Sequence, residues 1–111
     1  MAVAYIQEFP AGDHSTKNYD YVSEKIGDGP FDGLIAHTAG FDDDEGVFRI
    51  FDIWETREQA QRFLDEHIQP LIDEGPSSFP NPDNVFPPTK DSFYELHDVI
   101  VGAGVHAQIS S

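Results

Sequence analysis

The sequence contains no cysteine, few basic residues and no long apolar run, and each absence removes a class of function. Without cysteine, the chain can form no disulfide, no thiolate zinc site, no iron–sulfur cluster and no cysteine nucleophile. No stretch approaches the roughly 18 consecutive apolar residues of a membrane-spanning helix. The first residues also lack the charged, apolar and small-residue segments of a signal peptide. We therefore expect a soluble, cytoplasmic protein.

Positive charge is scarce as well. The chain carries 21 acidic residues against six basic ones, which gives a formal net charge of −15 at pH 7. A charge of this size and sign repels a phosphate backbone and an anionic bilayer, so nucleic acids and membranes are excluded as partners. The acidic excess fits a solvated surface, and it also fits a high-salt cytoplasm, because salt screens the repulsion.

The chain does contain enough apolar material for one core. Of its 111 residues, 39% are hydrophobic and 13% are aromatic. A chain of this length buries about two-thirds of the surface that it exposes when unfolded, which is sufficient for one core. We predict a single domain over residues 1–111.

Local patterns predict four strands and two helices. Thr56 and Gln59 have the spacing of a helix capping box, and an apolar stripe at helical spacing follows from Ala60 to Ile72. Breaker residues separate the other segments, such as Gly27 at the end of the first helix. The predicted elements are a strand over 2–9, a helix over 13–27, strands over 34–39 and 47–55, a helix over 56–72 and a strand over 92–101.

A proline-rich segment interrupts this order. Residues 75–90 hold five of the eight prolines, which excludes a regular helix or a central strand. We expect a stiff excursion over residues 75–92, held to the body by Phe79, Val85 and Phe86. The tail over residues 102–111 either extends the last strand or reaches a partner.

The order of elements, β-α-β-β-α-β, is typical of the ferredoxin-like α+β fold. In this arrangement a four-stranded antiparallel sheet carries both helices on one face. The strand over 47–55 is apolar on both of its faces. Because helices cover only one face of the sheet, we expect the other face to pack against a second copy of the chain. The sequence therefore predicts a homodimer.

The segment from Gly33 to Ile72 resembles a known superfamily. In it Ile53-Trp54-Glu55-Thr56 runs directly into an amphipathic helix. This pattern is similar to the dimeric α+β barrel superfamily, and within it to the antibiotic-biosynthesis-monooxygenase-like domains. The resemblance implies a dimeric α+β barrel with a pocket between sheet and helices. It also implies an activity among cofactor-free oxygenases of aromatic compounds, haem-degrading enzymes, small isomerases or decarboxylases.

The resemblance does not extend to haem binding. Trp54 matches in position the tryptophan that haem-degrading members use in their pocket. However, Gln7 and Glu8 stand where those members have an asparagine, and His67 lies about one turn later than their histidine ligand. We predict that the protein needs no cofactor.

The candidate site follows from strand register. If residues 41–46 form the turn, His37 lies opposite Ile50 and diagonal to Asp52, with Trp54 on the same face. An imidazole paired with a carboxylate could take a proton from a phenol or an activated carbon. The predicted catalytic residues are His37 and Asp52, and the predicted substrate-binding residues are Trp54, His67, Tyr5 and Tyr21.

Structural interpretations of the same residues remain open. His37 and His67 could be core histidines with one hydrogen-bond partner, and Trp54 could be core alone. Asp52 is different, because a buried carboxylate needs a partner. A one-residue slip in register would move all these side chains to the opposite face.

No metal site is predicted. The histidines at 14, 37, 67, 97 and 106 include no pair at i, i+4 and no HExxH motif. The acidic turn over residues 42–45 lacks the alternating ligand spacing of a calcium loop. Two functions remain: a cofactor-independent monooxygenase or related proton-transfer enzyme on a small aromatic substrate, or a non-catalytic dimer that binds a small ligand or acts as an accessory protein.

Overall fold

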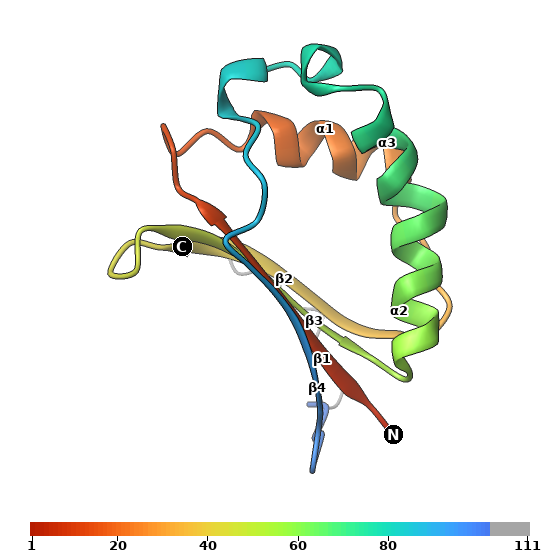
Figure 1. Ribbon diagram of the computed structural model, residues 1–111. Coiled ribbons are helices and arrows are strands. Elements are labelled where there is room, and N and C mark those ends of the chain that lie inside the picture. The colour runs from red at the N-terminus through yellow and green to blue at the C-terminus, as the bar shows by residue number, and fades with distance from the viewer. Residues whose placement is uncertain (103–111) are drawn as a thin grey trace.

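The computed structural model describes residues 1–102, which form an α+β fold on one open antiparallel sheet (Figure 1). The sheet order is β2-β3-β1-β4, as the ferredoxin-like arrangement requires. Helix α1 and the rod formed by α2 and α3 lie on the same side of this sheet (Figure 1). The strands and helices are β1 (Val3–Pro10), α1 (Lys17–Ile26), β2 (Leu34–Asp42), β3 (Val47–Trp54), α2 (Arg57–Phe63), α3 (Gln69–Asp73) and β4 (Lys90–Glu95).

The β2–β3 hairpin is longer than the sequence suggested. Strand β2 continues to Asp42, and the connecting loop ends at Gly46, whose φ of 68° suits glycine. His37 consequently lies opposite Asp52, so the predicted pairing of His37 with Ile50 is wrong. The extra pairs include Phe41 opposite Phe48, whose rings pack edge to face at 4.9 Å. The observed register differs from the predicted one by two residues, so each side chain keeps its predicted face of the sheet.

The first helix starts later than expected, at Lys17 rather than residue 13. The Asp13 carboxylate accepts a hydrogen bond from the Ser15 backbone N–H at 2.9 Å, and His14 has a positive φ of 61°. These two residues form a turn that a helix cannot contain. The helix ends at Gly27 as predicted, with a φ of 86°.

The second helix begins at the predicted cap and changes its winding halfway. The Thr56 hydroxyl accepts a hydrogen bond from the Gln59 backbone N–H at 3.2 Å, as a capping box requires. Residues Leu64–Ile68 then form a π-helical turn, η1, in which the Gln69 N–H bonds to the Leu64 carbonyl. Pro70 follows directly and has no N–H to donate, so the regular hydrogen-bond ladder cannot pass this point unchanged.

The last strand is shorter than expected. Strand β4 spans Lys90–Glu95 rather than residues 92–101, and it pairs only with β1. Glu95 pairs with Val3 at the start of β1, and the Leu96 N–H bonds to the Ala2 carbonyl at 2.9 Å. Beyond this bond the chain before β1 is too short to pair with a longer strand. The predicted tail lies mostly outside the described residues, as does the histidine at position 106.

The proline-rich excursion packs over α1. It contains two short 3₁₀ turns, η2 (Pro76–Ser78) and η3 (Pro82–Asn84). Asn18 of α1 donates to the backbone carbonyls of Asn81 and Asn84 at 2.9 and 3.3 Å, and it accepts from the Asn81 N–H at 3.0 Å. Phe79 packs against Tyr21 with ring centroids 5.5 Å apart. Phe79 therefore attaches the excursion to the body, as predicted, whereas its position over α1 was not predicted.

The two faces of the sheet differ in what covers them. The helix-covered face holds the core, which centres on Val3, Tyr5, Trp54 and Ala60. On the opposite face, no element of residues 1–102 covers the sheet (Figure 1). This uncovered face carries the half-buried side chains of Ile6, Phe51 and Ile53, which alternate with core residues in the strand registers.

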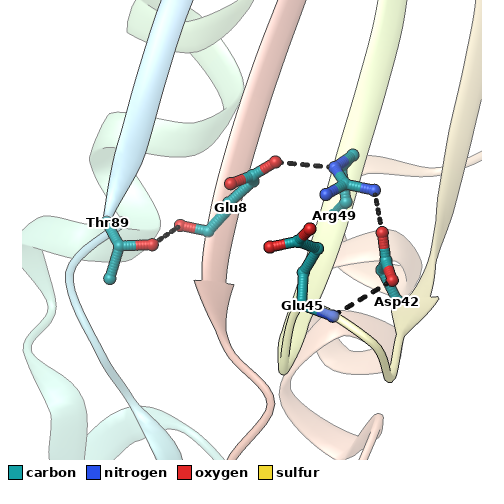
Figure 2. A network of polar contacts seen from close by, with 5 residues as sticks. All are labelled: Glu8, Asp42, Glu45, Arg49 and Thr89. Atoms are coloured by element: carbon teal, nitrogen blue, oxygen red, sulfur yellow. Dashed lines mark hydrogen bonds and ion pairs between the residues drawn. The ribbon is translucent and has the colours of Figure 1, made fainter.

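One charged cluster lies on the uncovered face (Figure 2). Arg49 donates to Glu8 and to Asp42, each at 2.7 Å, and so joins three adjacent strands. The Arg49 guanidinium, together with the Glu45 backbone N–H, holds the pKa of the Asp42 carboxyl below its usual range. The Thr89 hydroxyl bonds to the Glu8 carbonyl at 3.1 Å, which attaches the end of the excursion to β1. In the part of the chain that the structure describes, no helix is long and apolar enough to cross a membrane.

Candidate functional site

One row of side chains crosses all four strands on the helix-covered face. His37 of β2 lies opposite Asp52 of β3, Asp52 lies opposite Tyr5 of β1, and Tyr5 lies opposite Phe93 of β4. Adjacent strands are about 4.8 Å apart, so each residue of the row reaches its neighbour. The row brings three of the predicted site residues together.

His37 uses both of its ring nitrogens. Its Nδ1 lies 2.6 Å from Asp52 Oδ1, and its Nε2 lies 2.6 Å from the Tyr19 hydroxyl. The Asp52 residue is 6% exposed, whereas the His37 side chain is 40% exposed. An ionised carboxylate can only accept, so we assign the proton of a neutral His37 to Nδ1, and Nε2 accepts from the phenol.

Tyr19 is the site residue that sequence analysis missed. It lies in the first turn of α1, and its ring is parallel to the His37 ring, with centroids 6.1 Å apart. Burial, and then the Asp52 and Asp20 carboxylates, raise the pKa of its phenol. The phenol therefore stays protonated at neutral pH and acts as a donor. Its position in the sequence could have identified it, because Tyr19 is a polar aromatic residue in the stripe of α1 that faces the sheet.

Trp54 is part of the core. It is 1% exposed, packs against Phe63 at 5.3 Å and donates from Nε1 to Asp52 Oδ2 at 3.4 Å. Both oxygens of the Asp52 carboxylate therefore have a donor. The side chain predicted to stack on a substrate supports Asp52 from within the core and presents almost no surface.

His67 and Tyr21 do not join the row. His67 packs against Phe31 and Phe63, with centroid distances of 5.9 and 5.2 Å. Tyr21 packs against Phe79 of the excursion. The predicted constellation thus forms from His37, Asp52, Trp54 and Tyr5, with Tyr19 added. His67 and Tyr21 lie in neighbouring aromatic clusters instead.

The other end of the row consists of Tyr5 and Phe93. Tyr5 is 3% exposed, and its ring stacks on Phe93 with centroids 4.2 Å apart and planes 15° apart. Burial raises the pKa of its phenol, and the carboxylates of Asp91 and Asp52 add to the rise. Like Tyr19, Tyr5 therefore presents a protonated hydroxyl at neutral pH.

Two grooves open beside these residues. The larger has a volume of about 240 Å³ and lies between the rod of α2, η1 and α3 and strands β1 and β4, with Tyr5 and Phe93 in its lining. The smaller, of about 100 Å³, is lined by Phe31, Phe63 and His67 among others. Pockets that hold drug-sized ligands measure about 300 to 1,000 Å³, so either groove suits only a small ligand.

No metal-binding cluster forms in residues 1–102, where no three histidine or acidic side chains come together in a suitable arrangement. The acidic turn after β2 instead pairs with its surroundings, since Asp42 binds Arg49 and Asp43 lies 2.9 Å from His14.

The chain was compared with known proteins in three ways. A scan against protein-family models, a search of curated proteins and a search of solved structures each found no match.

Proposed function

We propose that this protein is a proton-transfer enzyme of the cofactor-independent monooxygenase type, built as a dimeric α+β barrel and acting on a small aromatic substrate. The observation that carries the proposal is the chain of Tyr19, His37 and Asp52, with two contacts of 2.6 Å and a buried carboxylate at its inner end. General bases positioned in this way contribute about 10²- to 10⁴-fold to a rate.

Proton transfer runs from the substrate through the Tyr19 hydroxyl to His37. An activated methylene group beside the aromatic ring of the substrate gives a proton to the Tyr19 oxygen while the phenol proton passes to His37 Nε2. The imidazolium that results is stabilised by Asp52, which already accepts from Nδ1. The substrate carbanion then gives its electron pair to dioxygen, the co-substrate, and the peroxide takes the proton back from His37 through Tyr19. Loss of water with the second methylene hydrogen leaves a carbonyl group, so that a methylene group and O₂ become a carbonyl group and water.

The outer end of the chain is accessible to a substrate. His37 lies on β2, an edge strand, and its side chain is 40% exposed. Tyr19 also packs edge to face against Phe48, with centroids 5.5 Å apart. These rings supply an aromatic surface for a flat substrate, the role that the sequence had assigned to Trp54.

Oxygen uptake with a panel of quinols and activated aromatic methylene compounds tests the proposal. We expect His37→Ala to lower the rate at least about 100-fold, because the acceptor of the phenol proton is lost. His14→Ala is the matched control, since His14 also pairs with an aspartate but is exposed. Full activity in a folded His37→Ala variant would remove His37 from the mechanism, and His37→Gln provides a variant of closer shape.

A second candidate function is a non-catalytic dimer that binds a small ligand or serves as an accessory protein. The observation in its favour is that both nitrogens of His37 and both oxygens of Asp52 already have partners within the chain. Thermal shift with aromatic ligands separates the two functions. Stabilisation without oxygen uptake by the unmodified protein favours the binding function.

The uncovered face supports the predicted homodimer. Ile6, Phe51 and Ile53 give this face an apolar surface, and Arg49 offsets part of the charge of Glu8 and Asp42 beside it. We expect light scattering to give twice the 12.4 kDa mass of the chain, and Phe51→Asp to give the monomer. The control is Ile72→Asp, an exposed apolar position on α3. A monomer at micromolar concentration would contradict the proposed barrel.

A further inference from the structure

One side-chain amide attaches the proline-rich excursion to α1. Asn18 Nδ2 donates to the Asn81 and Asn84 carbonyls at 2.9 and 3.3 Å, and Asn18 Oδ1 accepts from the Asn81 N–H at 3.0 Å. Asn81 directly precedes the η3 turn, and Asn84 ends it. An asparagine amide offers two donor hydrogens and one acceptor oxygen. All of them are used here to hold one turn of the excursion.

The excursion is also fixed to the loop before α1 and to the sheet. The Asn84 side chain packs so closely on Gly12 that a Cβ at this position would overlap its amide. At the end of the excursion, the N–H and the hydroxyl of Thr89 both donate to the Glu8 carbonyl of β1, at 2.7 and 3.1 Å. The excursion therefore connects α1 to the sheet.

The core contributes little to the position of α1. None of the ten residues of this helix is buried, and none belongs to the core cluster. At its N-terminus the Thr16 hydroxyl donates to the Asp20 carboxylate at 2.9 Å and so does not cap the helix. A helix shorter than about 12 residues is marginal in water without tertiary contacts. The attachment to the excursion is therefore a main support of α1.

Asn18 and Tyr19 are neighbours in the first turn of α1 but lie on different faces of it. Successive residues of an α-helix point about 100° apart. Asn18 and Tyr21 share the face towards the excursion, where the Tyr21 ring packs on Phe79 at 5.5 Å. Tyr19 lies on the face towards the sheet, with its hydroxyl 2.6 Å from His37 Nε2. A movement of this first turn therefore moves the phenol relative to the imidazole.

We propose that the excursion positions Tyr19 for proton transfer, and that Asn18 is the positioning residue that links them. The prolines of the excursion restrict its backbone, so the η3 turn gives Asn18 a stiff attachment. Asn18 in turn fixes the first turn of α1, which keeps the Tyr19 hydroxyl within hydrogen-bond distance of His37. The effect on rate rests on the proposed function, whereas the effect on the Tyr19–His37 hydrogen bond does not.

Nitrogen-15 NMR of the His37 ring in the full chain tests this link at the hydrogen bond itself. Asn18→Ala should move the Nε2 resonance towards the value that it has in Tyr19→Phe, and should move the Nδ1 resonance much less. Asn18→Asp has the same shape and keeps the acceptor oxygen, but it loses both donated hydrogen bonds. It should therefore move the Nε2 resonance in the same direction.

The matched control is Asn81→Ala. This substitution removes an exposed side-chain hydrogen bond to Asp13 but keeps the carbonyl and N–H that Asn18 binds. Both His37 resonances should stay where they are in the unmodified protein. An equal shift in this variant would mean that Asn18 is not the link.

Oxygen uptake tests the consequence for the rate. Asn18→Ala should lower the rate about tenfold, which is less than the roughly 100-fold that a misplacement of about 1 Å can cost. In the Tyr19→Phe background the same substitution should change the rate less than about twofold, because no phenol remains to be positioned. Equal losses in the two backgrounds would mean that Asn18 supports the fold and does not act through Tyr19.

The emission of Trp54, the single tryptophan and 1% exposed, shows whether the core of each variant is intact. An unshifted Nε2 resonance in Asn18 variants with an intact core would overturn the proposal. If both Asn18 variants lose the core signal, Phe79→Leu decides by the same shift, because it loosens the same attachment. A shifted Nε2 resonance without oxygen uptake by the unmodified protein would support the positioning and remove the proposed catalysis.

Discussion

Residues 1–102 contain two histidine–aspartate pairs, and they differ in burial. His14 and Asp43 lie 2.9 Å apart with side chains 56% and 77% exposed, and the His14 ring stacks on Phe41. His37 and Asp52 lie 2.6 Å apart, and the Asp52 side chain is only 9% exposed. The first pair connects the loop after β1 to the turn of the β2–β3 hairpin. The second pair connects the core, through His37, to the Tyr19 hydroxyl.

The difference shows that pairing alone does not make a site. An exposed pair is screened by water and contributes little to stability or to chemistry. A buried carboxylate is held in one position, and it requires donors to remain there. At His37 the second nitrogen also has a partner, Tyr19, so a proton has a defined path. His14 has no such third group among the described residues.

The largest expected effect that separates the pairs is on stability. Asp52→Ala leaves the His37 Nδ1–H and the buried Trp54 Nε1–H without their acceptor. We expect it to lower the free energy of unfolding by about 2 kcal/mol. Asp43→Ala should change it by less than about 0.5 kcal/mol, because both partners are exposed. Urea denaturation measures both values, and equal losses would mean that burial does not distinguish the pairs.

A smaller effect should follow from removing only the phenol. Tyr19→Phe keeps the ring but ends the hydrogen bond to His37 Nε2. If the proton passes through Tyr19, the rate of oxygen uptake should fall about 100-fold, at the low end of what one acid–base group contributes. Tyr21→Phe is the control, because Tyr21 lies on the same helix and packs against Phe79. A faster Tyr19→Phe enzyme would show that the phenol blocks His37 instead of serving it.

The third prediction concerns alkaline pH. The pKa values of Tyr5 and Tyr19 are raised in the folded protein, whereas tyrosines of the unfolded chain titrate near 10. The folded state therefore holds two protons that the unfolded state releases. This stabilisation is complete below about pH 10 and is lost as pH rises from there towards the folded pKa values.

The free energy of unfolding, measured from pH 8 to 11, should fall as pH rises. In Tyr5→Phe it should fall less steeply. Tyr94→Phe, at a residue that is 48% exposed, should leave the slope unchanged. The same slope in all three proteins would mean that the buried phenols do not titrate differently from an exposed one.

Much of the fold could be predicted from local sequence. The capping box at Thr56 and the end of α1 at Gly27 both depend on residues within one turn, and both were found as expected. Boundaries that depend on a partner strand were wrong. Strand β2 reaches Asp42 because Phe41 meets Phe48, and β4 ends at Glu95 because β1 begins at Val3.

The sequence could predict the candidate site only for residues whose face of the sheet follows from their odd or even position in a strand. His37, Asp52 and Tyr5 share a face in any even register, so their grouping survived an error of two residues. The position of Tyr19 depends on where α1 lies over the sheet, which no local pattern specifies. His67 and Tyr21 were misplaced for the same reason, since an apolar stripe does not say which neighbour each of its residues meets.

By itself the sequence determined the order of elements, the faces of the strands, the lack of α-helix and strand in the excursion up to Thr89 and the excess of acidic residues. These properties follow from residue type and from spacing over a few positions, where the chain itself sets the geometry. Only the tertiary structure decided that His37 joins Asp52 to Tyr19, that Trp54 is closed to solvent and that Asn18 attaches α1 to the excursion. Such contacts depend on the docking of helices and strands that are distant in sequence, which short-range spacing does not encode.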